Sequence, residues 1–406
     1  MNNTFYRLVP WLIASLFYAY QYILRVMPNI MMHDIMQQFS ISSSMFGQFS
    51  GVYYLGYALM HIPLGIALDL YGPKKVLPVC MLLTAAGLVP LITTSFWGFA
   101  LLGRLLIGIG SSGAILGLFK IIRLIFPEKQ FTRMLSVAVT IGLIGAIYGG
   151  APLSYLKNYF SYGDIVTALA VVACIMAAIM YFVLPPLQTT QQMPMGVTIR
   201  SVLLNAQVLF ICICAGLMVG PLEGFADVWG TEFLINTYGF DPMIAAALPS
   251  FIYLGMCFGG PILSDIAEKT SYVSTIVGSG LVMALSFGAL LTGMLSYFMI
   301  AFLFCIVGIC CAYQIIAIYY ASTRVPEHAM GITSAVANMI IMLFGYLFHT
   351  VIGIAIDYAP GTVAVQYTFC IAVIPVALVI VSICLLISSK NRLGHILIYI
   401  FEGLFS

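Results

Sequence analysis

The sequence is dominated by apolar runs of about 20 residues, separated by short polar or proline- and glycine-containing breaks. A hydrocarbon layer of about 30 Å is crossed by roughly 20 residues of helix, so runs of this length predict transmembrane helices. Strands of a membrane barrel alternate apolar and polar residues over about ten positions, and these runs do not alternate. The sequence therefore predicts an all-α membrane protein.

The composition excludes soluble and nucleic-acid-binding classes. Of 406 residues, 62% are hydrophobic and only 7% are charged, whereas a soluble domain carries about 25% charged residues. Fifteen Lys and Arg are matched by thirteen Asp and Glu, so no basic face for a nucleic acid can form. The ten cysteines lie in apolar runs without a C-x-x-C pair, which indicates neither disulfides nor a zinc site. We expect no cofactor, no metal and no catalytic residue, because no catalytic triad, H-E-x-x-H motif or phosphate loop is present.

Polar residues, prolines and glycines divide the sequence into twelve predicted spans. Their ranges are 10–31, 44–67, 76–95, 97–121, 134–156, 164–184, 202–227, 243–263, 272–293, 295–319, 329–355 and 366–388. A polar stretch in the middle separates two halves of six spans. The predicted parts are an N-terminal bundle (1–186), a cytoplasmic linker (187–200), a C-terminal bundle (201–389) and an interfacial tail (390–406).

Lysine and arginine residues outside the spans determine the predicted orientation. With a cytoplasmic N-terminus, twelve of the fifteen lie on the cytoplasmic side and only Lys157 lies on the other, while Arg25 and Arg104 lie within spans. The positive-inside rule therefore predicts that both termini are cytoplasmic. The N-terminus lacks a small-residue cleavage site, so we expect a retained first span rather than a signal peptide.

Two short motifs recur nearly 200 residues apart. A Pro-Glu pair precedes the fifth span at 127–128 and the eleventh span at 326–327, which is 199 positions later. A Tyr-Leu-Gly triplet at 54–56 in the second span recurs at 253–255 in the eighth. Chance similarity in a biased composition is the alternative, but two matches at equivalent places favour an internal duplication. Two six-helix halves in a parallel repeat are typical of transporters that bind substrate near the bilayer midplane.

The loop after the second span carries the most specific motif, formed by Gly65, Asp69, Gly72, Lys74 and Lys75. Gly65 would allow close helix packing, and Gly72 suits a tight turn. Asp69 at the helix end can pair with a cation or a helix N-terminus of the other half in one conformational state only. We interpret these residues as a gate, the alternative being a solvated turn with a helix-terminal acid.

The same five positions match the signature G-x-x-x-D-x-x-G-x-R/K-R/K, so the chain resembles the major facilitator superfamily. Arg104, Gly108 and Gly110 in the fourth span are similar to that family's R-x-x-x-G-x-G motif. The resemblance implies twelve helices in two pseudo-symmetric six-helix bundles and transport by alternating access. Asp265 occupies the corresponding loop of the second half, but the spacing of the motif is lost there, which leaves its gating role open. The fifth span lacks the Gly-Pro-x-x-Gly pattern of the family's exporters, which favours uptake.

More narrowly, the segment 15–28 resembles the phagosomal nutrient transporters of intracellular bacteria and the related lysosomal dipeptide transporter branch. That likeness implies uptake of amino acids, short peptides or nucleosides across a bacterial inner membrane.

Apart from residues at the very ends of spans, four charged residues lie within spans, where each charge costs about 2.5–3.5 kcal/mol on insertion scales. They are Arg25 and Arg104 in the first half and Glu223 and Asp227 in the second. Arginine can bind the carboxylate of a zwitterionic substrate through two hydrogen bonds, and a carboxylate can receive its ammonium group. Glu223 or Asp227 could also carry a coupling proton, because burial favours the protonated form. The alternatives are an outer gate or snorkelling for Arg25, helix packing for Arg104, and a surface position for both acids.

Further candidate substrate-binding residues are polar or aromatic and lie in the same or neighbouring spans. They are Tyr18, Gln21 and Tyr22 at helical spacing from Arg25, with Tyr57, Tyr313, Gln314 and Asn338 on other spans.

Together these patterns predict a monomeric secondary active transporter for proton-coupled uptake of an amino acid or short peptide. Its partners would be the small-molecule substrate, the proton and the lipid bilayer, with no enzyme activity. The alternatives are an importer of a larger anionic ligand, such as a siderophore, and a non-transporting receptor of the same fold.

Overall fold

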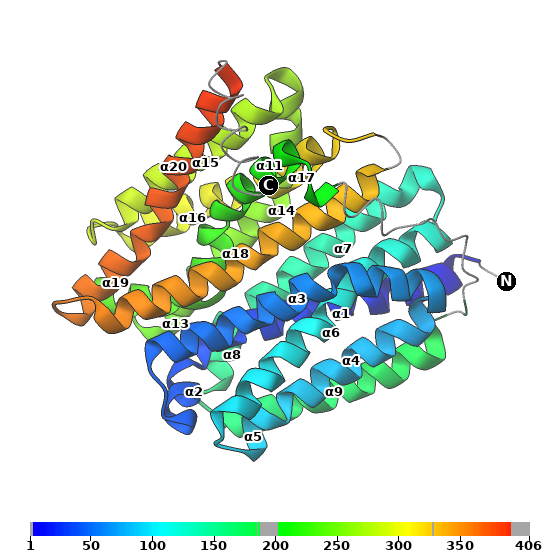
Figure 1. The fold of residues 1–406 in the computed structure, drawn as a ribbon. Coiled ribbons are helices and arrows are strands. Elements are labelled where there is room, and N and C mark those ends of the chain that lie inside the picture. The colour runs from blue at the N-terminus through cyan, green and yellow to red at the C-terminus, as the bar shows by residue number, and fades with distance from the viewer. Residues whose placement is uncertain (1–2, 185, 187–201, 327–328, 391–406) are drawn as a thin grey trace. The chain divides into compact units, whose positions relative to one another are not determined.

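The computed structural model describes residues 3–184, 186, 202–326 and 329–390, and the chain forms two compact units (Figure 1). Unit 1 is Met1–Gln192 and unit 2 is Met193–Ser406. All regular elements of the described residues are helices, which confirms the predicted all-α class. The predicted linker 187–200 and residues 391–406 of the predicted tail lie outside the described residues.

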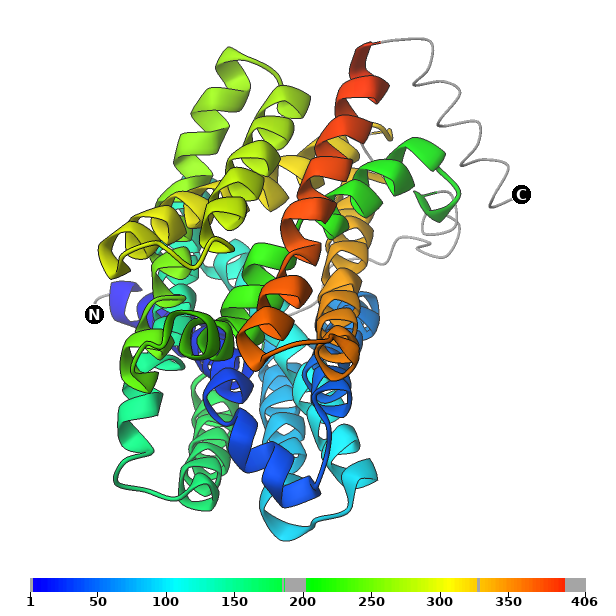
Figure 2. The ribbon, with the colours of Figure 1, turned by 90° about the vertical axis from the view of Figure 1, so that its left-hand side faces the viewer.

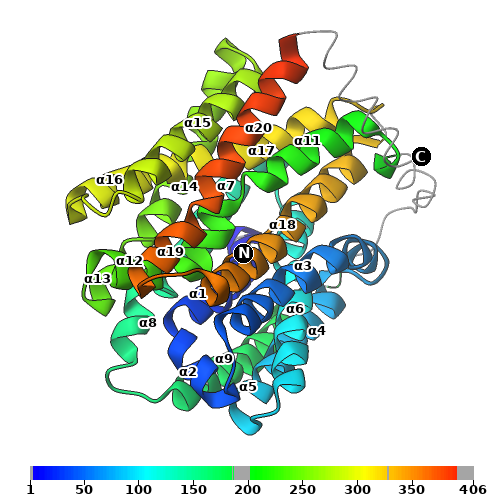
Figure 3. The same ribbon diagram turned by 60° about the vertical axis from the view of Figure 1, so that its left-hand side comes forward.

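Unit 1 combines long helices with three short ones. The helices are α1 (Asn3–Ile30), α2 (Met32–Phe39), α3 (Ser43–Tyr71), α4 (Pro73–Leu88), α5 (Pro90–Thr93), α6 (Trp97–Ile125), α7 (Glu128–Tyr148), α8 (Ala151–Leu156) and α9 (Tyr162–Val183). The short helices α2, α5 and α8 gather at one end of the unit (Figures 1 and 3). We call this the α2 end.

Unit 2 contains a π-helix within its first long segment. Its elements are α11 (Ala206–Leu217), η1 (Gly220–Trp229), α12 (Gly230–Tyr238), α13 (Pro242–Ala247), α14 (Ser250–Lys269), α15 (Tyr272–Leu290), α16 (Tyr297–Cys311), α17 (Tyr313–Ser322), α18 (Met330–Tyr358), α19 (Val363–Ile371) and α20 (Val373–Lys390). The last helix, α20, is red in Figure 2 and packs against α15.

Eleven helical segments of the described chain are long and apolar enough to cross a membrane. They coincide with the second to twelfth predicted spans. Helix α1, at the position of the first predicted span, has 28 residues and is also long enough. Its tyrosines, Gln21 and Arg25 make it less apolar than the other eleven.

One predicted boundary is wrong by a wide margin. The seventh segment runs from Ala206 to Tyr238, whereas the predicted span ends at 227. Gly220, Pro221 and Gly224 suggest a helix end, because proline lacks the backbone N–H of the helical ladder. The wider hydrogen bonding of the π-helix η1 carries the segment through these residues instead.

Helices α3 and α6 approach so closely in unit 1 that glycine is required at the contact. A Cβ added at Gly108 would lie 2.1 Å from the carbonyl oxygen of Tyr53. From the other side, a Cβ added at Gly56 would lie 2.6 Å from the carbonyl oxygen of Leu105. The two backbones are therefore in direct contact, as small residues allow between membrane helices.

The same pair of contacts recurs between α14 and α16 in unit 2. A Cβ added at Gly308 would lie 2.0 Å from the carbonyl oxygen of Ile252, and one added at Gly255 would lie 2.0 Å from that of Cys305. These four residues are offset by 199 or 200 positions from their counterparts in unit 1. The repeated packing supports the predicted duplication and explains why the Tyr-Leu-Gly triplet recurs.

We expect Gly308→Ala to lower the free energy of unfolding by about 1–3 kcal/mol, because the added methyl group forces the two backbones apart. Gly288→Ala in α15 is the matched control, since its added Cβ meets no described atom within 4 Å. Thermal unfolding in detergent measures both. Equal stabilities of the two variants would contradict the close contact.

Candidate functional site

Helix α1 buries one polar face within unit 1. Tyr18, Gln21, Tyr22 and Arg25 lie on this face and are all buried. The hydroxyl of Tyr53 in α3 donates a hydrogen bond of 2.6 Å to Gln21 Oε1. The Tyr18 and Tyr22 hydroxyls lie 3.5 Å apart. The helical spacing read from the sequence thus corresponds to one connected group of side chains.

Arg25 lies against two aromatic rings. Its Cζ atom is 5.2 Å from the ring centroid of Tyr22 and 5.0 Å from that of Tyr54 in α3. Such cation–π contacts contribute about 0.5–1 kcal/mol each when exposed and more when desolvated, and the Arg25 side chain is only 5% exposed. The rings stabilise the guanidinium group and orient its planar fork.

Tyr57 extends this group along α3. Its ring stacks on that of Tyr53 at 6.1 Å and lies 5.3 Å from the ring of His61. All three side chains are buried, so an aromatic column continues the polar face of α1.

Arg104 in α6 is fully buried and holds the backbone of α1. Its Nη1 donates to the carbonyl oxygen of Leu24 at 2.8 Å, and its Nη2 donates to that of Arg25 at 3.3 Å. Pro28 has no N–H, so the Leu24 carbonyl four residues earlier lacks its helical donor. Arg104 supplies the missing donor, and it thereby braces the turn of α1 that carries Arg25.

In unit 2, Glu223 and Asp227 lie in the π-helix η1 and expose 1% and 0% of their surface. A surface position for these acids is therefore excluded within the unit. π-Helical turns are found frequently at functional sites. Among the described residues, no group of three His, Cys, Asp or Glu side chains could hold a metal ion.

Each of the two acids has a hydrogen-bond donor from another helix of unit 2. The Tyr253 hydroxyl of α14 donates to Asp227 Oδ1. Gln314 Nε2 of α17 donates to Glu223 Oε1 at 3.3 Å, which is long for such a bond.

Two further predicted residues of unit 2 lie on other helices. The Tyr313 hydroxyl donates to the Ala215 carbonyl oxygen at 2.7 Å and so links α17 to α11. Asn338 is half-buried on α18.

The predicted gate residues lie where α3 ends and α4 begins. Asp69 pairs with Lys120 Nζ of α6 at 2.6 Å, and therefore has a partner inside its own unit. The half-buried Lys74 lies 5.8 Å from the ring centroid of Tyr181 in α9, while Lys75 is exposed.

The two glycines of this motif differ in their structural role. Gly72 caps α3 with a φ of 76°, a conformation that glycine adopts without strain. A Cβ added at Gly65 would meet no described atom within 4 Å, so the close packing predicted at Gly65 is not observed. In unit 2, Asp265 pairs with Lys269 on the surface of its own helix.

Four contacting residues are absent from the predicted site. Tyr53 and Tyr54 contact the α1 face, Lys120 pairs with Asp69, and Tyr253 contacts Asp227. The repeated Tyr-Leu-Gly triplet could have identified Tyr54 and Tyr253, because they occupy equivalent positions in the two halves. Each contacts a buried charged residue of its own unit.

We expect Arg104→Met to destabilise the protein by about 1–3 kcal/mol, because the Leu24 carbonyl is left without a donor in a buried place. Pro28→Ala restores the helical N–H to that carbonyl, so Arg104→Met should cost less in a Pro28→Ala background. Unfolding measurements on the two single variants and the double variant test this coupling. Strictly additive effects would show that Arg104 does not replace the donor lost at Pro28.

Comparison with known proteins identifies the family. The sequence model of the Major Facilitator Superfamily matches residues 12–349. No curated protein matches the sequence significantly.

Several solved structures share the fold. A bacterial homologue of the human lysosomal transporter Spinster, in an inward-facing and occupied conformation, aligns with a TM-score of 0.75 and 16% identity, over 96% of this chain and 98% of that chain. The nucleoside transporter NupG aligns with a TM-score of 0.75 and 15% identity, over 94% and 100% of the two chains. A D-xylose–proton symporter aligns with a TM-score of 0.74 and 13% identity, over 95% and 97%.

Identities this low establish a common fold and nothing finer, so the likeness to phagosomal nutrient transporters stays a prediction. The family model, in contrast, covers most of the chain and agrees with the loop motif and the repeated halves. The chain therefore belongs to the Major Facilitator Superfamily and is a multi-pass membrane transporter.

Proposed function

We propose that this transporter takes up a small zwitterionic nutrient, an amino acid or short peptide, together with protons. The supporting observation is that buried charges separate by sign. Among the described side chains, the buried cations Arg25 and Arg104 belong to unit 1, and the buried acids Glu223, Asp227 and Glu232 belong to unit 2. A zwitterion carries both charges and can be recognised by one group of each kind. We propose that it acts as a monomer in a bacterial inner membrane, with both termini cytoplasmic.

Arg25 is the proposed ligand of the substrate carboxylate. Tyr22 and Tyr54 orient its guanidinium group, whose fork matches the two oxygens of a carboxylate. Tyr18, Gln21 and Tyr57 provide polar and aromatic contacts next to it. Arg104 contributes indirectly, because two of its N–H groups bond to the backbone of α1.

Glu223 is the proposed proton carrier of unit 2. Asp227 receives a hydrogen bond from the Tyr253 hydroxyl, and hydrogen bonds to charged groups are strong. The amide hydrogen bond that Glu223 accepts from Gln314 is long and therefore weak, which suits a carboxyl group that gains and loses a proton. In this proposal Asp227 meets the substrate ammonium group, with Tyr313, Gln314 and Asn338 as uncharged polar contacts.

Glu223→Gln should abolish accumulation driven by a pH gradient while substrate exchange at equal pH persists. A gradient of one pH unit corresponds to about 1.4 kcal/mol, a tenfold accumulation, for each coupled proton. Proteoliposomes with an acidic exterior and radiolabelled amino acids and dipeptides measure both activities.

Glu232→Gln is the matched control, because Glu232 is also buried but contacts Asn236 of its own helix. Full accumulation by the Glu223→Gln variant would exclude Glu223 as proton carrier. Accumulation of a bulky anion while zwitterions are ignored would favour the siderophore-type alternative.

The gate residues supply a second proposal, in which Asp69 exchanges partners during the cycle. The Asp69 side chain is 46% exposed and that of Lys120 is 20% exposed. An ion pair this exposed contributes at most about 1 kcal/mol to stability. Asp69 can therefore exchange Lys120 for another partner at a small cost in free energy. Gly65, Gly72, Lys74 and Lys75 would shape the turn that presents Asp69.

Asp69→Asn and Lys120→Met should each slow the transport cycle severalfold with little change in substrate affinity. Transport rates in proteoliposomes and binding in detergent separate the two effects. Asp265→Asn serves as the control, because Asp265 forms a similar pair on an exposed helix surface. Weaker binding at an unchanged transport rate would contradict the gate assignment.

A further inference from the structure

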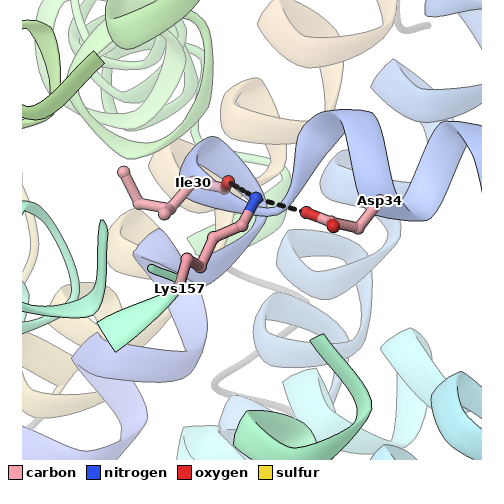
Figure 4. Close-up of polar contacts among 3 residues, drawn as sticks. All are labelled: Ile30, Asp34 and Lys157. Atoms are coloured by element: carbon pink, nitrogen blue, oxygen red, sulfur yellow. Dashed lines mark hydrogen bonds and ion pairs between the residues drawn. The ribbon is translucent and has the colours of Figure 1, made fainter. Parts of the chain in front are cut away.

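Lys157 connects three helices at the α2 end of unit 1. It caps α8, and its Nζ atom donates to the carbonyl oxygen of Ile30 at 3.0 Å (Figure 4). The same Nζ donates to a carboxylate oxygen of Asp34. Ile30 is the last residue of α1, and Asp34 lies in the first turn of α2.

The contact with Ile30 provides a hydrogen-bond donor for a carbonyl oxygen at the end of α1, where the helix itself provides none. Carbonyls in the last turn of a helix lack helical donors, and the negative end of the helix dipole attracts a cation there. The side chains of Lys157 and Asp34 are 27% and 31% exposed, so the ion pair is partly shielded from water. Lys157 therefore binds α1 more firmly than a fully exposed lysine would.

Helix α2 is a fixed anchor for this connection. Gln38 Nε2 donates to the carbonyl oxygens of Leu91 at 2.9 Å and Thr94 at 3.0 Å. The Phe39 ring lies 6.0 Å from that of Trp97 in α6. Because α2 is bound at its far end, Asp34 holds Lys157, and Lys157 holds the end of α1.

The end of α1 needs this support because the series of backbone hydrogen bonds within the helix is interrupted there. Pro28 removes the helical bond to Leu24, and this gap lies between Arg25 and the Ile30 carbonyl. Ile30 is five residues beyond Arg25, or about 7.5 Å along the helix. Arg104 binds the backbone at Leu24 and Arg25, so Lys157 is the second point at which a cation holds this weakened segment.

We propose that Lys157 is a positioning residue of the substrate site. By binding the Ile30 carbonyl and Asp34, it fixes the end of α1. It thereby fixes the position of Arg25 along the helix axis and its rotation about that axis. This inference rests on the proposed function, in which Arg25 binds the substrate carboxylate.

The test compares Lys157→Met, Lys157→Arg and Asp34→Asn with the unchanged chain. The first variant removes both contacts, the second retains a cation, and the third keeps the Ile30 contact while weakening the other. Lys269→Met is the control, because Lys269 forms an exposed ion pair on α14. Two quantities are measured. The first is hydrogen exchange of the backbone amides between 24 and 31, Pro28 excepted, and the second is the affinity for the tightest-binding member of a panel of free amino acids and alanyl dipeptides.

Lys157→Met should raise exchange at the end of α1 and weaken zwitterion binding, each by about tenfold, as expected for loss of a charge-assisted hydrogen bond. Asp34→Asn should have a smaller effect on both. Lys157→Arg should restore both quantities, and Lys269→Met should change neither. Unchanged exchange at 24–31 in Lys157→Met would overturn the proposal, as would raised exchange with unchanged affinity.

Arg25→Gln separates this inference from the function on which it rests. If Arg25→Gln weakens zwitterion binding and Lys157→Met does not, the positioning role of Lys157 alone is wrong. If Arg25→Gln leaves binding unchanged, the proposed function fails, and the positioning role of Lys157 fails with it.

Discussion

Lipid offers no hydrogen bonds, so every polar group that a span carries into the membrane must find its partner within the protein. Unit 1 meets this constraint by combining two groups that are each costly alone. Pro28 leaves the Leu24 carbonyl without a helical N–H donor, and Arg104 brings side-chain N–H donors into a buried place where they need acceptors. Their hydrogen bond satisfies both groups and joins α6 to α1. The position of Arg25 depends on this contact, because Arg25 lies on the turn that Arg104 holds.

The internal repeat gives the two units one framework for opposite charges. In each unit a tyrosine of the repeated Tyr-Leu-Gly triplet contacts a buried charged residue: Tyr54 lies against Arg25, and Tyr253 donates to Asp227. The glycine that ends each triplet makes the close helix contact that sets the position of the tyrosine. A tyrosine suits both roles, because its ring face attracts cations and its hydroxyl donates to carboxylates. One ancestral packing arrangement can thus support a cationic site in one half and an acidic site in the other.

The sequence predicts the helices well and their mutual contacts poorly, for a physical reason. Span length and hydropathy reflect the thickness of the membrane, so the twelve spans follow from local sequence. The partners of Asp69 and Asp227 depend on how neighbouring helices are rotated, which no single helix encodes. The end of the seventh span was misplaced because Gly220 and Pro221 usually terminate an α-helix, whereas η1 continues by widening its hydrogen bonding. Helix α2 escaped prediction because it is short and only half apolar.

A transporter needs contacts that persist through its cycle and contacts that exchange, and burial distinguishes the two kinds in unit 1. The bonds of Arg104 are fully buried, and breaking them would leave polar groups unsatisfied in a place without water. The pair of Asp69 with Lys120 is partly solvated, so water can replace either partner at little cost. Motion is therefore expected at the end of α3, while α1 and the Arg25 that it carries stay fixed to α6. A substrate ligand on the braced helix keeps its geometry while the solvated end of the unit changes partners.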